Sequence, residues 1–177
     1  QVPSGFVEEA NDTSADPQGT FDYSILAGAG HPRLLADSKG FASLKRKVTT
    51  DRMYNGTLYK LHTAVITRAD KLIEAERTFT STDEQAIIVD NLLHCAYAYK
   101  MTGESKYLDK VKTDMQKVCA FSDWAPDDLP IGEISLAMAL AYDWLYYDLP
   151  YDLRVLARQN MSTKGVRPMY NKSYAKT

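Results

Sequence analysis

The stretch IGEISLAMALAYDWLYYDL, residues 131–149, decides the fold class. Fourteen of its nineteen residues are apolar or aromatic, and they fall on every side of a helix. A helix that is apolar all round is buried by its neighbours. Asp143 and Asp148 must therefore find polar partners or lie at an end that opens to water. Asp148, close to Pro150, is expected to serve the start of the next helix. The stretch thus predicts an inner helix of an all-helical protein.

Helix-start and helix-stop signals predict a hairpin directly before this stretch. Thr82 to Gln85 has the form of a capping box, which satisfies free N–H groups at a helix start. The helix that begins there runs to Gly103, because glycine suits the left-handed conformation that often follows a helix end. Ser105 is expected to cap the second helix, whose apolar residues form one stripe up to Cys119. Two antiparallel helices follow from these signals.

Further helices are expected upstream. Asp37 or Ser38 can cap a short helix over residues 39–48. Apolar residues at three-to-four spacing predict a longer helix at 52–77.

Successive hairpins indicate an all-α fold with antiparallel neighbours. Residues 1–30 hold glycines, prolines and small polar residues without a sustained period, which predicts an irregular N-terminal arm with a candidate strand at 20–26. The helical domain covers 31–177. Its last helix opens at Pro150, is basic, and is interrupted near Gly165 and Pro168.

Composition excludes some classes of function. The 177 residues carry a net charge of −2, which does not suggest a nucleic-acid-binding protein. Six bases stand against Asp152 alone from Tyr151 onward, so this tail is +5 and the preceding 150 residues are −7. The basic tail either faces an anionic partner or forms a solvated helix face. No membrane span is expected, because charged residues interrupt the longest apolar run.

The cysteines and histidines predict no redox or metal chemistry. On antiparallel helices Cys95 and Cys119 would be offset by about 10 Å, too far for a disulfide, so both are expected to be buried free thiols. His31, His62 and His94 are scattered without metal-ligand spacing, and no cofactor is expected. We interpret His31 as a surface turn residue. His94 and Cys95 point about 100° apart on a helix and form no catalytic dyad.

Five stretches, in this order, resemble the N-terminal part of the heparinase II/III-like polysaccharide lyases. They are HPRLL (31–35), LKRKV (44–48), AYAYKMTGESKYLDKVKTDMQKVCAFSDWAP (96–126), GEISLAMALAYDWLYYDLP (132–150) and LARQNMSTKGVRPMY (156–170). The resemblance implies part of an incomplete (α/α) toroid, in which paired helices surround a substrate groove. It also implies β-elimination on uronic-acid polysaccharides of the heparan sulfate, heparin or alginate type. A secreted or periplasmic bacterial protein is then expected.

The sequence departs from that family at the residues that carry the chemistry. The asparagine-rich motif is expected just beyond Tyr170, but NKSYAKT (171–177) does not match it, and the later tyrosine and histidine motifs do not occur. Asp127 and Asp128 stand where the family often has a histidine. We therefore assign no catalytic residue, and we expect this segment alone to be inactive.

Candidate substrate-binding residues follow from the chemistry of sugars. Aromatic rings can stack on pyranose rings, and a carboxylate can bind sugar hydroxyls. An aromatic stripe at helical spacing also fits a core, and the helix dipole alone can explain a carboxylate in a first turn. The candidates are Trp124, Glu133, Tyr142, Trp144 and Tyr146.

Two further expectations concern partners. The expected partner is an acidic polysaccharide, and an open helical flank with Trp144 and Tyr147 at its rim would allow self-association. The alternative function is a non-catalytic helical-hairpin module of tetratricopeptide type that binds a protein or a glycan. Such a module should show a period near ~34 residues, and only the hairpin at 83–120 is convincing.

Overall fold

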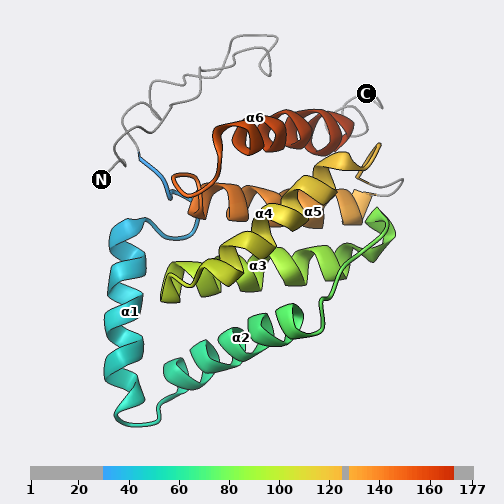
Figure 1. The fold of residues 1–177 in the computed structure, drawn as a ribbon. Helices are drawn as coiled ribbons and strands as arrows, with labels where there is room; N and C mark the ends of the chain where they lie inside the picture. Colours follow the sequence, from blue (N-terminus) through green and yellow to red (C-terminus); the bar gives the residue numbers. More distant parts are fainter. Residues whose placement is uncertain (1–29, 125–127, 170–177) are drawn as a thin grey trace.

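The computed structural model describes residues 30–124 and 128–169, and all regular structure in these ranges is helical (Figure 1). The elements in chain order are α1 (Ser38–Arg52), α2 (Thr57–Glu74), the 3₁₀ turn η3 (Thr82–Glu84), α3 (Gln85–Thr102), α4 (Ser105–Ala120), α5 (Asp128–Trp144), α6 (Tyr151–Asn160) and the π-helical turn η4 (Met161–Val166). The all-α prediction is confirmed. The expected arm at 1–30 and the candidate strand at 20–26 lie outside the described residues, apart from Gly30.

Local capping chemistry sets the helix ends. Asp37 is the N-cap of α1, and its carboxylate accepts from the Gly40 N–H at 2.6 Å, as predicted. Gly103 ends α3 with φ of 79°, the left-handed conformation expected there. The capping box forms one residue earlier than predicted, between Ser81 and Glu84. The prediction that Ser105 is an N-cap was wrong, because Ser105 is already the first residue of α4.

The boundary between α1 and α2 differs from the predicted one because of Asp51. Its carbonyl accepts from the Gly56 N–H at 3.0 Å, and its carboxylate accepts from the Tyr59 N–H at 2.8 Å. Asn55 adopts a left-handed φ of 48° between them. These contacts end α1 at Arg52 and allow α2 to begin at Thr57, so the expected helix at 52–77 starts five residues later.

The central helix is α3 and not α5. It packs against α2, α4 and α5, and its buried residues form the middle of the core. The prediction that neighbours bury residues 131–149 on all sides was wrong, because Leu136 is 58% exposed. Leu129, which precedes that stretch in the first turn of α5, is 70% exposed. An open flank on this helix was also expected from the sequence. α5 also ends at Trp144, and a turn leads from Leu145 to Pro150.

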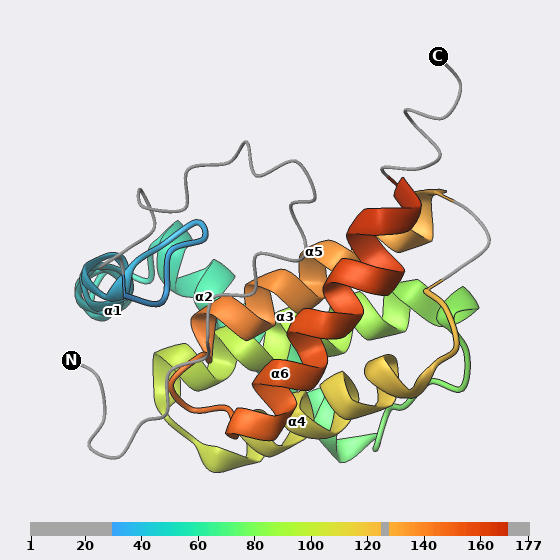
Figure 2. The ribbon, with the colours of Figure 1, turned by 90° about the horizontal axis from the view of Figure 1, so that it is seen from above.

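The helices form two adjacent rows with one outlier. α3 contacts α5 and α4 contacts α6, while α3 and α4 form the expected hairpin. In Figure 1 α1 runs across the direction of the other helices, and in the perpendicular view of Figure 2 it is seen nearly end-on. No described helix has the length and apolar character needed to cross a membrane.

Two basic residues of the C-terminal tail make contacts within the fold. Arg154 is 1% exposed, and its guanidinium lies 4.6 Å from the ring centre of Tyr146. Lys164 donates to the carbonyls of Cys119 and Phe121 at the end of α4. The tail is therefore more than a solvated basic face. The π-helical turn η4, which contains Lys164, is the interruption that the sequence predicted near Gly165.

Both cysteines are buried free thiols, as predicted. Burial raises the pKa of Cys95 to about 12 and that of Cys119 to about 11. Neither thiol is therefore an activated nucleophile.

Candidate functional site

The segment that follows Gly30 is bound to the end of α5 through one carboxylate. Asp143 lies 2.6 Å from His31 Nδ1, and it accepts from the backbone N–H groups of Arg33 at 2.7 Å and Leu34 at 2.8 Å. These contacts join residues about 110 positions apart in the sequence. Asp143 is 4% exposed, so three donors replace the water that it loses on burial.

The second nitrogen of His31 is also occupied. Arg33 Nη2 lies 2.6 Å from His31 Nε2. Because a guanidinium can only donate, Nε2 must accept, and the ring proton then sits on Nδ1 and points to Asp143. Burial on its own would raise the pKa of Asp143, but the hydrogen bonds from His31, Leu34 and Arg33 outweigh it and hold this pKa below its usual value.

Aromatic rings enclose this cluster. Tyr146 stacks on the His31 ring at 3.8 Å between centres, and Tyr142 meets it edge-on at 6.2 Å. Trp144 donates from its indole N–H to the Leu34 carbonyl at 2.9 Å. We call this unit, made of residues 31–34 and Asp143, the motif junction. The interpretation of His31 as a surface turn residue was wrong, because its side chain is 11% exposed and fully engaged.

Asp148 has a different role from the one predicted. It accepts from the Tyr99 hydroxyl at 3.0 Å, and so ties the end of α3 to the turn after α5. The N-cap of α6 is Pro150, with no side-chain hydrogen bond.

A second cluster lies beside an open groove between α3 and α5. The groove has a volume of about 510 Å³. Its apolar lining consists of Ala86, Val89, Leu93 and Leu136, and its titratable lining consists of Asp90, His94 and Glu133. An apolar cleft with a few polar groups is the usual form of a small-ligand site. We call it the α3–α5 groove, and it is the candidate functional site.

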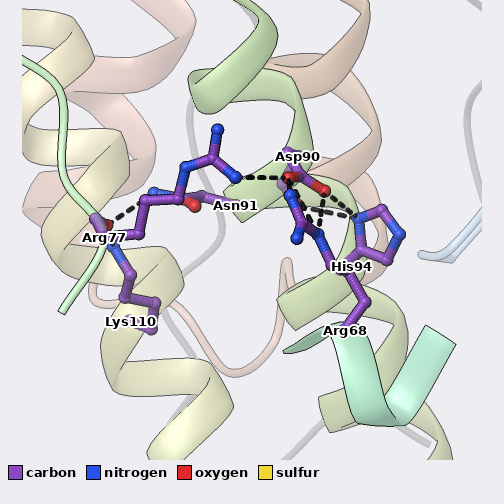
Figure 3. A network of polar contacts seen from close by, with 6 residues as sticks. All are labelled: Arg68, Arg77, Asp90, Asn91, His94 and Lys110. Atoms are coloured by element: carbon purple, nitrogen blue, oxygen red, sulfur yellow. Dashed lines mark hydrogen bonds and ion pairs between the residues drawn. The ribbon is translucent and has the colours of Figure 1, made fainter. Parts of the chain in front are cut away.

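Asp90 and His94 form an oriented pair on one wall of this groove (Figure 3). His94 Nδ1 lies 2.9 Å from the Asp90 carboxylate and 2.9 Å from the Asp90 carbonyl oxygen. A carbonyl only accepts, so Nδ1 carries the proton and the neutral ring keeps its lone pair on Nε2. Nε2 has no hydrogen-bond partner in the described ranges, and the His94 side chain is 32% exposed. Nε2 is therefore free to bind a ligand or accept a proton.

Two arginines hold Asp90 in place. Arg68 from α2 binds both oxygens of the Asp90 carboxylate, and Arg77 Nη1 lies 3.3 Å from it. The Arg77 carbonyl in turn accepts from Asn91 at 3.0 Å and from Lys110 at 2.8 Å (Figure 3). Burial would raise the pKa of Asp90, but the Arg68 hydrogen bond and the charges of His94 and both arginines lower it overall. Asp90 therefore stays ionised beside His94.

Glu133 is the one predicted residue that reaches this groove. It lies six positions into α5, which begins at Asp128, so the helix dipole of a first turn does not account for it. It forms no ion pair or hydrogen bond within 30–124 and 128–169. Its carboxylate thus faces the groove opposite Asp90 and His94 without a structural partner.

The other predicted binding residues lie elsewhere. Trp124 is fully buried and donates to the Val118 carbonyl at 3.1 Å, so it cannot stack on a sugar. Tyr146, 3% exposed, is likewise enclosed. Tyr142 and Trp144 are partly exposed but contact the motif junction and not the groove. The Asp90–His94 pair was not predicted from the sequence, although an acid and a histidine four positions apart on a helix share one face.

No group of three or more potential metal ligands occurs in the part of the chain that the structure describes. Comparison with known proteins adds no assignment: no family model matches the chain, and no curated protein matches it.

Proposed function

We propose that the chain is the N-terminal helical portion of a polysaccharide lyase that cleaves uronic-acid polymers by β-elimination. The observation that carries the proposal is the motif junction. Two stretches through which the sequence resembles those lyases, 31–35 and 132–150, meet in one unit centred on Asp143. The contact gives a physical reason why both stretches belong to the resemblance, because each supplies part of one hydrogen-bonded unit. The helical hairpins α3/α4 and α5/α6 are compatible with part of an (α/α) toroid.

The α3–α5 groove gives this portion a place to hold a saccharide. Apolar side chains along its walls can pack against sugar rings, and Glu133 and His94 Nε2 can accept hydrogen bonds from sugar hydroxyls. The Glu133 carboxylate repels a uronate carboxylate, so the hydroxyl-rich edge of the sugar is expected on this side. β-Elimination also requires a group that neutralises the uronate and a base that removes the C5 proton. We assign neither to these residues.

The test compares the 177-residue chain with the product of the whole open reading frame that encodes it. Both are incubated with heparan sulfate and alginate, and the absorbance of the unsaturated product is followed. We expect product from the whole protein and none from the 177-residue chain. Robust turnover by the 177-residue chain, or a reading frame that ends at Thr177, would contradict the proposal.

A second candidate function is a helical-hairpin module that binds a protein segment. The groove itself favours it, because α3 and α5 are the first helices of successive hairpins and most of the groove lining is apolar. An amphipathic helix could lay its apolar face into such a groove. Self-association would use the same open side, where Leu129 and Leu136 are exposed. Trp144 and Tyr147, which we expected at its rim, both contact the segment at 31–34.

Sedimentation of the purified chain separates these candidates. A concentration-dependent dimer that the Leu136→Glu variant converts to a monomer favours the protein-binding module. A monomer that binds uronate oligosaccharides, with Glu133→Gln weakening that binding, favours the lyase portion.

A further inference from the structure

The α1–α2 hairpin is one of two basic segments in an otherwise acidic chain, and the other is the tail from Tyr151 onward. Between Ser38 and Glu74 eight bases stand against three acids, a net charge of +5 in a chain whose total is −2. The bases are Lys39, Lys45, Arg46, Lys47, Arg52, Lys60, Arg68 and Lys71. A local charge of this size attracts anions even where the whole molecule does not.

Two of the three acids in this hairpin are already engaged. Asp51 accepts from the Tyr59 N–H at 2.8 Å and so serves the turn between the helices. Asp70 accepts from Lys106 at 2.7 Å and from the Tyr107 hydroxyl at 2.8 Å, both on α4. The Lys106 hydrogen bond lowers the pKa of Asp70, which therefore stays ionised for that contact. Only Glu74 has no such partner within the described ranges.

Arg68 is neutralised by Asp90 on α3, but four of the other bases have no such partner. Lys60 and Lys71 on α2 and Arg46 and Lys47 on α1 are exposed, and none forms an ion pair with another residue of 30–124 or 128–169. Exposed cations without partners add little to folding stability. They remain available for a ligand.

These cations line two shallow grooves on either side of the α1–α2 turn. The larger follows α2 and has a volume of about 560 Å³, lined by Asn55, Tyr59, Lys60, Thr63, Ala64, Thr67, Arg68 and Lys71. The other lies on α1, with a volume of about 530 Å³ and a lining of Ser43, Arg46, Lys47, Thr50, Asp51, Tyr54 and Leu58. Lys60 and Lys71 are eleven positions apart, about 16 Å along the helix axis. The charged surface is therefore elongated.

We propose that this surface, the α1–α2 cationic face, binds an acidic polysaccharide along α2. Sulfate or carboxylate groups contact Lys60 and Lys71, because ammonium groups donate strong hydrogen bonds to such anions. Thr63 and Thr67 lie between these cations and bind sugar hydroxyls. Tyr59 supplies a ring surface at the end of the groove.

The chemistry of the lining favours a saccharide over other polyanions. A helix that enters a membrane surface inserts bulky apolar side chains, and the only apolar or aromatic residues that line the α2 groove are Ala64 and Tyr59. A single-stranded nucleic acid binds through bases that stack on several aromatic rings, and Tyr59 is the only aromatic residue that lines the α2 groove. An acidic polysaccharide carries hydroxyls between its charges, as the groove carries threonines between its bases.

This inference rests on the proposed function for its ligand class, but its binding residues, Lys60 and Lys71, do not line the α3–α5 groove. It describes binding and not cleavage. If the whole protein cleaves uronic-acid polymers but changes on α2 do not affect binding, the proposed function stands and this inference fails. If the chain binds along α2 but the whole protein cleaves none of these polymers, this inference stands and the proposed function fails.

The experiment measures binding of the 177-residue chain to size-defined heparin and alginate oligosaccharides by calorimetry at low salt. The test variant is Lys60→Gln/Lys71→Gln. The matched control is Lys39→Gln/Lys112→Gln, which removes the same charge away from the two grooves. Circular dichroism checks that both variants fold.

We expect the test variant to bind about tenfold more weakly than the control, as two exposed ionic contacts are lost. Added salt should abolish the difference. Equal loss in both variants, or no binding by the unmodified chain, would overturn the inference. So would tighter binding to phosphatidylserine vesicles or to single-stranded DNA than to either oligosaccharide.

Discussion

The molecule contains two aspartate–histidine pairs with similar contacts and opposite surroundings. In the motif junction Asp143 lies 2.6 Å from His31 Nδ1, and in the α3–α5 groove Asp90 lies 2.9 Å from His94 Nδ1. In both pairs the ring proton sits on Nδ1, so the chemical state of the imidazole is the same. The pairs differ in what meets the other nitrogen.

In the motif junction every polar atom of the pair has a partner. His31 Nε2 accepts from Arg33, and Tyr146 covers the ring. In the groove His94 Nε2 has no partner in the described ranges, and the two arginines contact Asp90. A fully satisfied pair stabilises the fold, whereas a pair with one free nitrogen can act on a ligand. The difference teaches that an oriented histidine indicates function only when its second nitrogen is free.

The largest expected effect is on stability at the motif junction. Asp143→Ala leaves His31 Nδ1 and two backbone N–H groups without an acceptor in a nearly water-free position. We expect the free energy of unfolding to fall by about 3–5 kcal/mol, measured by urea titration. Asp90→Ala should cost only about 1 kcal/mol, because Arg68 and Arg77 are exposed enough to be solvated by water.

Thiol accessibility provides the folding control for this comparison. Cys95 and Cys119 are buried in the native protein, so they should react with a thiol reagent only in variants that have unfolded. Equal destabilisation by Asp143→Ala and Asp90→Ala would remove the distinction between the two pairs.

Acid should weaken the motif junction in a defined pH window. The pKa of Asp143 in the folded protein lies below its ordinary value of 3.8, so the folded state binds fewer protons than the unfolded state near that pH. Its stabilising contribution is therefore complete above that value and is lost as the pH falls through the folded pKa. Below about pH 4, Asp143→Asn should show a shallower loss of unfolding free energy than the unmodified chain.

Asp114 acts in the opposite direction, because burial raises its pKa. Asp114 is present in both the unmodified chain and the Asp143→Asn variant, so its effect on the unfolding free energy should cancel in the difference between them. Parallel pH profiles for the two proteins would contradict the stabilising role of Asp143.

His31 and His94 should differ in chemical reactivity, and their substitution should have different effects on the stability of the protein. Diethyl pyrocarbonate attacks an unprotonated ring nitrogen, and only His94 offers a free Nε2 at a groove. Peptide mapping by mass spectrometry should therefore show faster modification of His94 than of His31. His31→Gln is expected to cost about 1–2 kcal/mol and His94→Gln less than about 0.5 kcal/mol. Faster modification of His31 would reverse the assignment of the two pairs.

The sequence predicts the helices well, because their signals are local. Asp37 and Gly103 act on the few residues beside them, and both behave as expected. The exposure of α5 was mispredicted because apolar content shows how hydrophobic a helix is. It does not show how many other helices pack against it. Leu136 remains exposed, although apolar residues fall on every side of the stretch 131–149.

The candidate site was only partly predictable for a related reason. Glu133 could be named from its position in an apolar stretch, but its neighbours Asp90 and His94 come from another helix and meet it only through packing. His31 shows the same limit. Its local sequence suggests a turn, and its partner Asp143 lies 112 positions away.

The smallest expected effect on stability, at Glu133, is the one that tests function most directly. Glu133 has no partner in the described residues and lies beyond the first turn of α5, so Glu133→Gln should change the unfolding free energy by no more than about 0.5 kcal/mol. A glutamine keeps the volume and one acceptor oxygen but removes the charge opposite Asp90 and His94. If the groove binds sugar hydroxyls, calorimetry should show that the Glu133→Gln variant binds uronate oligosaccharides more weakly than the unmodified chain. The reason is that a neutral acceptor forms weaker hydrogen bonds than a carboxylate. Glu76→Gln, at an exposed carboxylate outside the groove without an ion pair in the described residues, is the matched control and should leave binding unchanged. A variant that loses stability and keeps its binding would make Glu133 a structural residue, and the α3–α5 groove would then have no functional group on its α5 wall.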